Sequence, residues 1–324
     1  MFLPSFQILV GLFLLTVGGH YLVEGATRIA LRARLSPMVV GLTIVALGTS
    51  MPELAVSLGA AFRGSTDISY ANVVGSNIFN VAAVLGVTAL IWPIPVKGQT
   101  IRAEYPFMVL ALFATLVISR DGTVDRLDGV LLLAGLAGFF VFMLRLSRGQ
   151  PPDQETVELQ RAFADMADAT GGSSRPLFGS IAMVGIGIAA LVGGADLMVR
   201  GAVSVAERFG ITERVIGLTI VAGSTSLPEL AATLAAASKG RPGIALGNVI
   251  GSNIFNVLCI LGTTSLLVEI PVNPRAIALD NWVMVGVALA LFVFLARGQR
   301  VTRWEAALLL ASFVAYMGYV VTAV

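Results

Sequence analysis

Cysteine and histidine are almost missing from this sequence, and charged residues are scarce. The 324 residues include one cysteine, Cys259, and one histidine, His20, and only 12% of them are charged. A single cysteine excludes an intramolecular disulfide and a thiolate metal cage. A single histidine excludes a histidine cluster for zinc or di-iron chemistry. A soluble domain carries about 25% charged residues, so this composition excludes a soluble enzyme.

Apolar residues take the place of the missing charge. They make up 56% of the chain, and the mean hydropathy is +0.89. Because a membrane-spanning helix needs about 20 apolar residues, we expect an all-α polytopic membrane protein with ten transmembrane helices. The apolar runs lie at about 6–24, 37–60, 69–91, 104–119, 127–146, 177–199, 215–238, 244–267, 278–296 and 304–322.

Lysine and arginine in the loops predict the orientation in the membrane. We call the N-terminal side of the membrane side A and the opposite side side B. Loops on side B hold 14 of the 21 basic residues, so side B is expected to be cytosolic and both termini extracytoplasmic. The polar stretch 147–176, with Pro151-Pro152 and a Gly-Ser run, is predicted to be a cytosolic linker. The net charge of +2 forms no basic block, which argues against nucleic acid as a partner.

The chain contains two copies of one sequence at a constant offset of 176. Residues 41–54 (GLTIVALGTSMPEL) return as 217–230 (GLTIVAGSTSLPEL), and residues 72–81 (NVVGSNIFNV) return as 248–257 (NVIGSNIFNV). We therefore expect a first five-helix repeat over 1–146, with its motif at 41–81, and a second over 177–324, with its motif at 217–257. Five spans are an odd number, so the second copy is predicted to be inverted, with the binding site near the midplane between the copies.

Two glutamates fall inside predicted spans at equivalent positions, Glu53 and Glu229. An ionisable group there costs at least about 2.5–3.5 kcal/mol to insert, so each is a candidate functional residue. Each follows a proline, and because Pro52 and Pro228 lack an N–H, the carbonyls of Gly48 and Ser224 lose their helical partners. Such a broken helix is expected to line a cation site with main-chain oxygens and with the hydroxyls of Thr49, Ser50, Thr225 and Ser226.

The second motif adds further polar oxygens. Ser76 and Asn80 are four residues apart, as are Ser252 and Asn256, so each pair shares one helix face. We favour coordination for Asn80 and Asn256. For the remaining asparagines of the motif, coordination and simple helix packing are equally open; these are Asn77 and Asn253.

All candidate ligands are oxygen atoms, which favours a hard cation and argues against zinc or copper. Calcium takes 6–8 oxygens, and two bidentate glutamates with two main-chain carbonyls would supply about six; magnesium ranks second because it demands a tighter octahedron. One Ca²⁺ neutralises two carboxylates, and two or three Na⁺ would occupy the same oxygens. A site that holds either load, but not both, and is unstable when empty predicts an antiporter.

At these residues the sequence resembles the sodium/calcium exchangers of the calcium:cation antiporter superfamily, of the prokaryotic type. The family's repeats carry the Gly-Thr-Ser-x-Pro-Glu and Gly-Ser-Asn-Ile-Phe-Asn motifs, and the resemblance covers the whole chain. It implies Glu53 and Glu229 as principal calcium ligands, with main-chain oxygens from Thr49 and Thr225. The remaining sodium and calcium ligands that it implies are Ser50, Ser226, Ser76, Ser252, Asn80, Asn256, and the carbonyls of Ala46 and Ala222.

The chain also departs from some members of that family. Potassium-dependent and some prokaryotic exchangers have aspartate at the position of Asn256, so the case for potassium cotransport is weak here. The linker is too short for a cytosolic calcium-sensing domain. The Thr-Ser pair favours sodium coupling over the proton-coupled branch, which usually reads Gly-Asn-x-x-Glu.

The expected function is therefore exchange of Ca²⁺ for Na⁺ by alternating access, in a multi-pass protein of the plasma or inner membrane. A proton-coupled antiporter of Ca²⁺ or another divalent cation is the alternative, and a cation channel is less favoured because channels need weak binding at several sites along a pore. No enzyme activity is expected, because His20 and Cys259 are isolated and the glutamates lack a companion nucleophile. We expect no cofactor; the partners are Ca²⁺, Na⁺ and the lipid bilayer, with no obligate protein partner.

Overall fold

The computed structural model describes residues 2–33, 37–64, 66–147, 177–208 and 222–322. Seven helices in these ranges are long and apolar enough to cross a membrane, and a bent pair raises the number to eight. The expected helical, polytopic membrane fold is therefore confirmed. The ten-span count stays a prediction, because the linker and the start of the seventh span lie outside the described residues.

The helices of the first half are α1 (Phe2–Ala33), α2 (Pro37–Val40), α3 (Ala46–Thr49), α4 (Met51–Phe62), α5 (Thr66–Ile78), α6 (Leu85–Ile91), α7 (Gly98–Arg102), α8 (Glu104–Ile118) and α9 (Arg126–Ser147). Those of the second half are α11 (Leu177–Arg208), α13 (Ala222–Thr225), α14 (Leu227–Ser238), α15 (Pro242–Phe255), α16 (Gly262–Leu267), α17 (Asn281–Gly298) and α18 (Arg303–Thr322). Within the described residues, four π-helical segments continue these helices, at Gly41–Val45, Phe79–Val84, Asn256–Leu261 and Ala276–Asp280.

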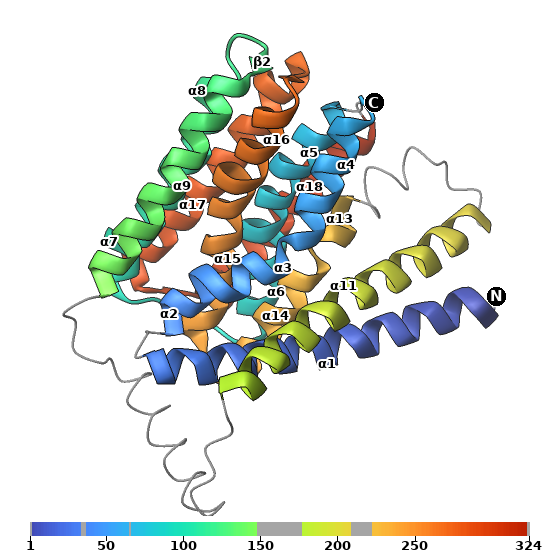
Figure 1. The fold of residues 1–324 in the computed structure, drawn as a ribbon, viewed down its shortest axis with the longest axis vertical. Helices are drawn as coiled ribbons and strands as arrows, with labels where there is room; N and C mark the ends of the chain where they lie inside the picture. The colour runs from blue at the N-terminus through green and yellow to red at the C-terminus, as the bar shows by residue number, and fades with distance from the viewer. Residues whose placement is uncertain (1, 34–36, 65, 148–176, 209–221, 323–324) are drawn as a thin grey trace, which may run out of the picture.

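Helices α1 and α11 lie side by side along one flank of the bundle (Figure 1). Each has 32 residues and extends past the apolar run that predicted it. Glycine makes their close approach possible: a Cβ on Gly18 would lie 2.9 Å from the carbonyl oxygen of Gly187, and one on Gly194 would lie 2.9 Å from that of Gly11. These pairs run in opposite order along the chain, so the two equivalent helices are antiparallel.

Two short antiparallel sheets join the halves. Strand β1 (Ile94–Pro95) pairs with β4 (Arg300–Val301), and β2 (Thr123–Val124) pairs with β3 (Ile270–Pro271). Strands β1 and β3 are the two copies of the repeated Ile-Pro-Val segment. Each copy therefore ends by pairing with a strand of the other half, and not with one of its own.

The repeated motifs lie at the centre of the bundle. In α15, every residue from Ile244 to Phe255 is buried, whereas helices farther out present large apolar side chains at the surface, such as Leu110 and Phe178. An apolar exterior suits contact with lipid. The polar residues of the motifs consequently have to be satisfied by one another or by a bound ion.

Candidate functional site

Each half contains a helix that breaks at a serine. Helix α3 ends at Thr49 and α4 begins at Met51, with a 44° bend between Met38–Thr49 and Met51–Phe62. The intervening Ser50 has φ −83° and ψ 8°. Its counterpart Ser226, between α13 and α14, has φ −90° and ψ 7°. In both halves a proline follows in the first turn of the new helix, which explains the break, since proline cannot donate to the preceding turn.

The serine at each break contacts the glutamate of the opposite half. The Ser50 hydroxyl donates to Glu229 Oε1 over 2.9 Å, and the Ser226 hydroxyl donates to Glu53 Oε1 over 3.0 Å. Both carboxylates are buried, with 1% of Glu53 and 0% of Glu229 exposed. The two sequence motifs, 176 residues apart, therefore form one polar centre.

No basic side chain of the described residues forms an ion pair with either glutamate. The second oxygen of each carboxylate, Oε2, is buried without a hydrogen-bond partner there. Further buried polar atoms without a partner in the described residues come from the second motif: Ser76 Oγ, Asn80 Oδ1 and Nδ2, Asn253 Oδ1, and Asn256 Oδ1. Such unpaired oxygens around two carboxylates are the ligands that a hard cation requires.

Two other predicted ligands, Ser252 and Ala46, contact these groups directly. The Ser252 hydroxyl donates to Glu229 Oε1 over 3.4 Å. The Ala46 carbonyl accepts the Ser50 N–H over 3.0 Å and lies 3.3 Å from the Thr49 hydroxyl. Ala222 begins α13, at the position equivalent to Ala46 at the start of α3. No group of three or more His, Cys, Asp or Glu side chains that could hold a metal occurs in the described part of the chain.

Two residues of this centre escaped the sequence analysis, Asn72 and Asn248. The Asn72 amide donates to the Glu53 carbonyl over 3.2 Å and to the Ser57 hydroxyl over 2.9 Å. The Asn248 amide donates to the Glu229 carbonyl and to the Thr233 hydroxyl over the same two distances. A signal for both was available, because each asparagine opens its copy of the second motif.

The same asparagines also reach the opposite half. The Thr49 hydroxyl donates to Asn248 Oδ1 over 3.2 Å, and the Thr225 hydroxyl donates to Asn72 Oδ1 over 3.3 Å. Each asparagine thus holds the glutamate turn of its own half and the threonine before the break in the other half. A side chain that fixes candidate ligands in this way acts as an outer support of the site.

The asparagines for which two roles were open differ from each other. Asn77 Oδ1 accepts a hydrogen bond from the amide of Asn256, in the opposite half, over 3.2 Å. The Asn253 amide instead donates to the Val249 carbonyl, one turn earlier in its own helix, over 3.0 Å. Asn77 therefore supports a candidate ligand, whereas the Asn253 amide makes a contact within its own helix.

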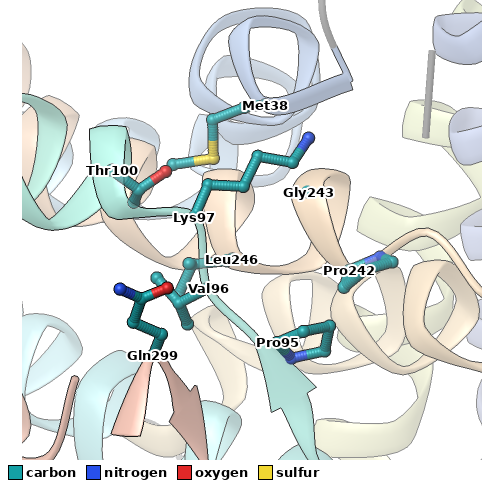
Figure 2. Close-up of a pocket in the computed structure, with 9 residues that line it drawn as sticks. All are labelled: Met38, Pro95, Val96, Lys97, Thr100, Pro242, Gly243, Leu246 and Gln299. Carbon is teal, nitrogen blue, oxygen red and sulfur yellow. The ribbon is translucent and has the colours of Figure 1, made fainter. Parts of the chain in front are cut away.

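A cavity of about 350 Å³ lies elsewhere, at the end of the bundle where β1 and β4 meet. In Figure 2, the Lys97 side chain extends past Met38 beside the start of α15, and Gln299 lies below Lys97 in this view. None of the twelve predicted ligands lines this cavity, so it is separate from the polar centre.

Comparison with known proteins gives matches over the whole chain. The model of the family described as sodium/calcium exchanger protein matches residues 4–145 and 179–322. CaxA of Alkalimonas amylolytica, a protein named as an antiporter, is 39% identical over 319 residues, which is 98% of each chain. The sodium/calcium exchanger MaX1 of Methanosarcina acetivorans is 33% identical, with 96% of each chain covered.

Solved structures agree with these relatives. The sodium-calcium exchanger NCX_Mj, in crystals soaked with Na⁺ and Sr²⁺, superposes with a TM-score of 0.83. The sequence identity is 32%, and the match covers 98% of both chains.

Proposed function

We propose that this chain, which belongs to the sodium/calcium exchanger protein family, is an antiporter that exchanges Ca²⁺ for Na⁺ through the polar centre between its halves. Proteins of this family are exchangers, not enzymes. The observation that carries the proposal is the pair of buried glutamates, each bound by a serine of the opposite half and neither paired with a basic side chain in the described residues.

Charge balance connects this observation to exchange. Two carboxylates in a low-dielectric interior are unfavourable without compensating charge. One Ca²⁺ supplies that charge, and so do two or more Na⁺ on the same oxygens. Because the empty site is unfavourable, the protein changes its accessible side most readily when one load or the other is bound, which couples the two fluxes.

The proposed ligands are the twelve residues predicted from the sequence, with Glu53 and Glu229 at the centre. Six or more oxygens meet the requirement of Ca²⁺. Asn72, Asn248 and Asn77 are proposed as supports that orient these ligands and do not themselves bind the ion.

Alternating access needs two halves of opposite orientation, and we propose ten spans arranged as two inverted five-helix repeats. The antiparallel packing of α1 on α11 and the strand pairs between the halves support this arrangement. The excess of basic residues in the side-B loops supports a cytosolic side B, with a cytosolic linker and both termini extracytoplasmic, in the cell membrane.

The test is ⁴⁵Ca²⁺ uptake into proteoliposomes loaded with Na⁺ and diluted into Na⁺-free buffer. Uptake should follow the Na⁺ gradient, stop when that gradient is dissipated, and vanish in Glu53→Gln and Glu229→Gln. Matched vesicles with only a proton gradient or only a potassium gradient serve as controls.

Each alternative predicts a different result in the same experiment. Uptake driven by the proton gradient alone would make the protein a proton-coupled divalent-cation antiporter and overturn sodium coupling. Ca²⁺ flux without any counter-ion would indicate a channel and overturn exchange altogether.

A further inference from the structure

A group of charged side chains, here called the Glu24 cluster, joins the end of α1 to the turn between α14 and α15. Glu24 accepts hydrogen bonds from Arg28 over 3.2 Å, Lys239 over 3.5 Å and Arg241 over 3.3 Å. Arg241 also donates to the Thr27 hydroxyl over 2.9 Å. The charged side chains are only 12–22% exposed, so these contacts are stronger than those of an exposed surface pair.

The cluster fastens α1 onto a helix pair that carries half of the proposed ion site. Lys239 also donates to the His20 carbonyl of α1 over 3.2 Å. Further along the interface, a Cβ on Gly19 would lie 3.0 Å from the Ala231 carbonyl oxygen of α14. Glu229 is in α14, and Ser252 is in α15. Helix α1 is thus held against one side of the site by glycine packing and by ion pairs.

The equivalent place in the other half has the opposite electrostatics. The offset of 176 places Arg200 at the position of Glu24, and Lys239 at the position equivalent to Arg63. Arg200 pairs with Asp196 on its own helix, and their side chains are 68% and 54% exposed. Arg63 is exposed and makes no ion pair within the described residues. The attractive cluster of one half is therefore matched by two arginines in the other.

This difference affects the two access states unequally. If α11 packed on α4 as α1 packs on α14, the equivalent contact would bring Arg200 toward Arg63, and like charges repel. The existing contact places one carboxylate among three cations. Burial lowers the pKa of the Lys239 ammonium, and the neighbouring Glu24 carboxylate opposes that shift. Without this carboxylate, the three cations would repel one another.

We infer that Glu24, which lies outside the ion site, controls transport by holding the exchanger closed at its side-B end. The exchanger therefore rests open toward side A. This inference rests on the proposed function and on the cytosolic assignment of side B. Opening toward side B requires the Glu24 cluster to break, whereas among the described residues no ion cluster of this kind opposes opening toward side A. The two faces of the transporter therefore differ in how readily they open.

The experiment measures opening without measuring transport. In a Cys259→Ser background, Ala231→Cys places a thiol on α14 beneath α1, and its rate of labelling by a maleimide is followed in proteoliposomes. With Glu24 present, labelling should be slow. Glu24→Gln should accelerate it about fivefold, because the closed state loses the free energy of a part-buried ion cluster.

A matched control comes from the other half. Asp196→Asn breaks the exposed pair with Arg200 and should leave the labelling rate unchanged. Ca²⁺-dependent thermal stabilisation should persist in Glu24→Gln, because the ion site is intact in that variant. Labelling that is unchanged in Glu24→Gln, or equally accelerated in Asp196→Asn, would overturn the inference. Loss of Na⁺ dependence in uptake would overturn the proposed function instead, and leave the labelling result standing.

Discussion

The two halves of this protein agree at the polar centre and differ at the ends of α1 and α11. At the centre, the serine–glutamate contacts measure 2.9 and 3.0 Å in the two directions, and the four asparagine contacts repeat in pairs at 3.2 and 2.9 Å. At the ends, Glu24 stands where the other half has Arg200. The halves are therefore alike at the proposed ion site.

A physical reason accounts for this contrast. An ion at the proposed site would contact both copies, so a change in one copy would alter the environment of the whole site. Helix α1 meets the α14–α15 turn at the Glu24 cluster, whereas Arg200 of α11 pairs with Asp196 on its own helix. These positions do not face the proposed ion site, so they are free to carry different charges, as Glu24 and Arg200 do.

Removing either central charge is the most severe test of the equivalence. Glu53→Gln and Glu229→Gln should each reduce Ca²⁺ uptake at least about a hundredfold, because the amide keeps the shape of the side chain and loses the charge that binds the ion. Initial uptake rates in proteoliposomes measure the effect. Asp67→Asn, an exposed carboxylate in α5, is the control and should be silent. Full activity in either glutamine variant would refute the site.

Loss of a serine at the break should have the next largest effect. Ser50→Ala and Ser226→Ala each remove one hydrogen bond to a buried carboxylate, and we expect the concentration of Ca²⁺ for half-maximal uptake to rise about tenfold. The two variants should match within about twofold, since the contacts are reciprocal. A large effect in only one of them would mean that the halves contribute unequally to the ion site.

The asparagine supports provide a test of positioning without direct contact to the ion. Asn72→Ala and Asn248→Ala should each lower the apparent Ca²⁺ affinity several-fold, up to about tenfold, with a smaller change in the maximal rate. Asn281→Ala is the matched control, because Asn281 is equally buried and its amide donates to the hydroxyls of Tyr70 and Ser119, neither of which is a candidate ligand. Equal losses in Asn281→Ala and Asn248→Ala would indicate a general packing effect.

The smallest effect is expected at the one pair of equivalent positions where the asparagine contacts of the two halves differ chemically. Asn72 donates to Ser57, whereas Asn248 donates to Thr233. Thr233→Ser keeps the hydroxyl and makes the two halves alike, so uptake should change by less than about twofold. Thr233→Val removes the hydroxyl at nearly constant volume and should resemble Asn248→Ala. If both variants behave alike in the uptake assay, the hydroxyl of Thr233 has no role.

Much of the polar centre could be anticipated from single positions. Glu53 and Pro52 are recognisable because a carboxylate and a helix breaker are costly inside an apolar span, and their repetition at Glu229 and Pro228 marks both as one site. Asn72 was missed although it repeats as Asn248, because an asparagine at a helix face is common and its partners are distant in sequence. The lengths of α1 and α11 were underestimated, because hydropathy detects only their apolar part and both helices continue through charged residues.

The sequence by itself decides the membrane character and the positions of the helix breaks, since each depends on residues close together along the chain. It also decides the duplication, which is visible when two stretches 176 residues apart are compared. Packing decides which groups meet. The contacts of Ser50 with Glu229, of Asn248 with Thr49, and of Glu24 with the α14–α15 turn join residues about 180 to 220 positions apart. Nothing along the chain specifies such pairs, because they arise only when the two halves pack against each other and buried polar groups find the nearest available partners.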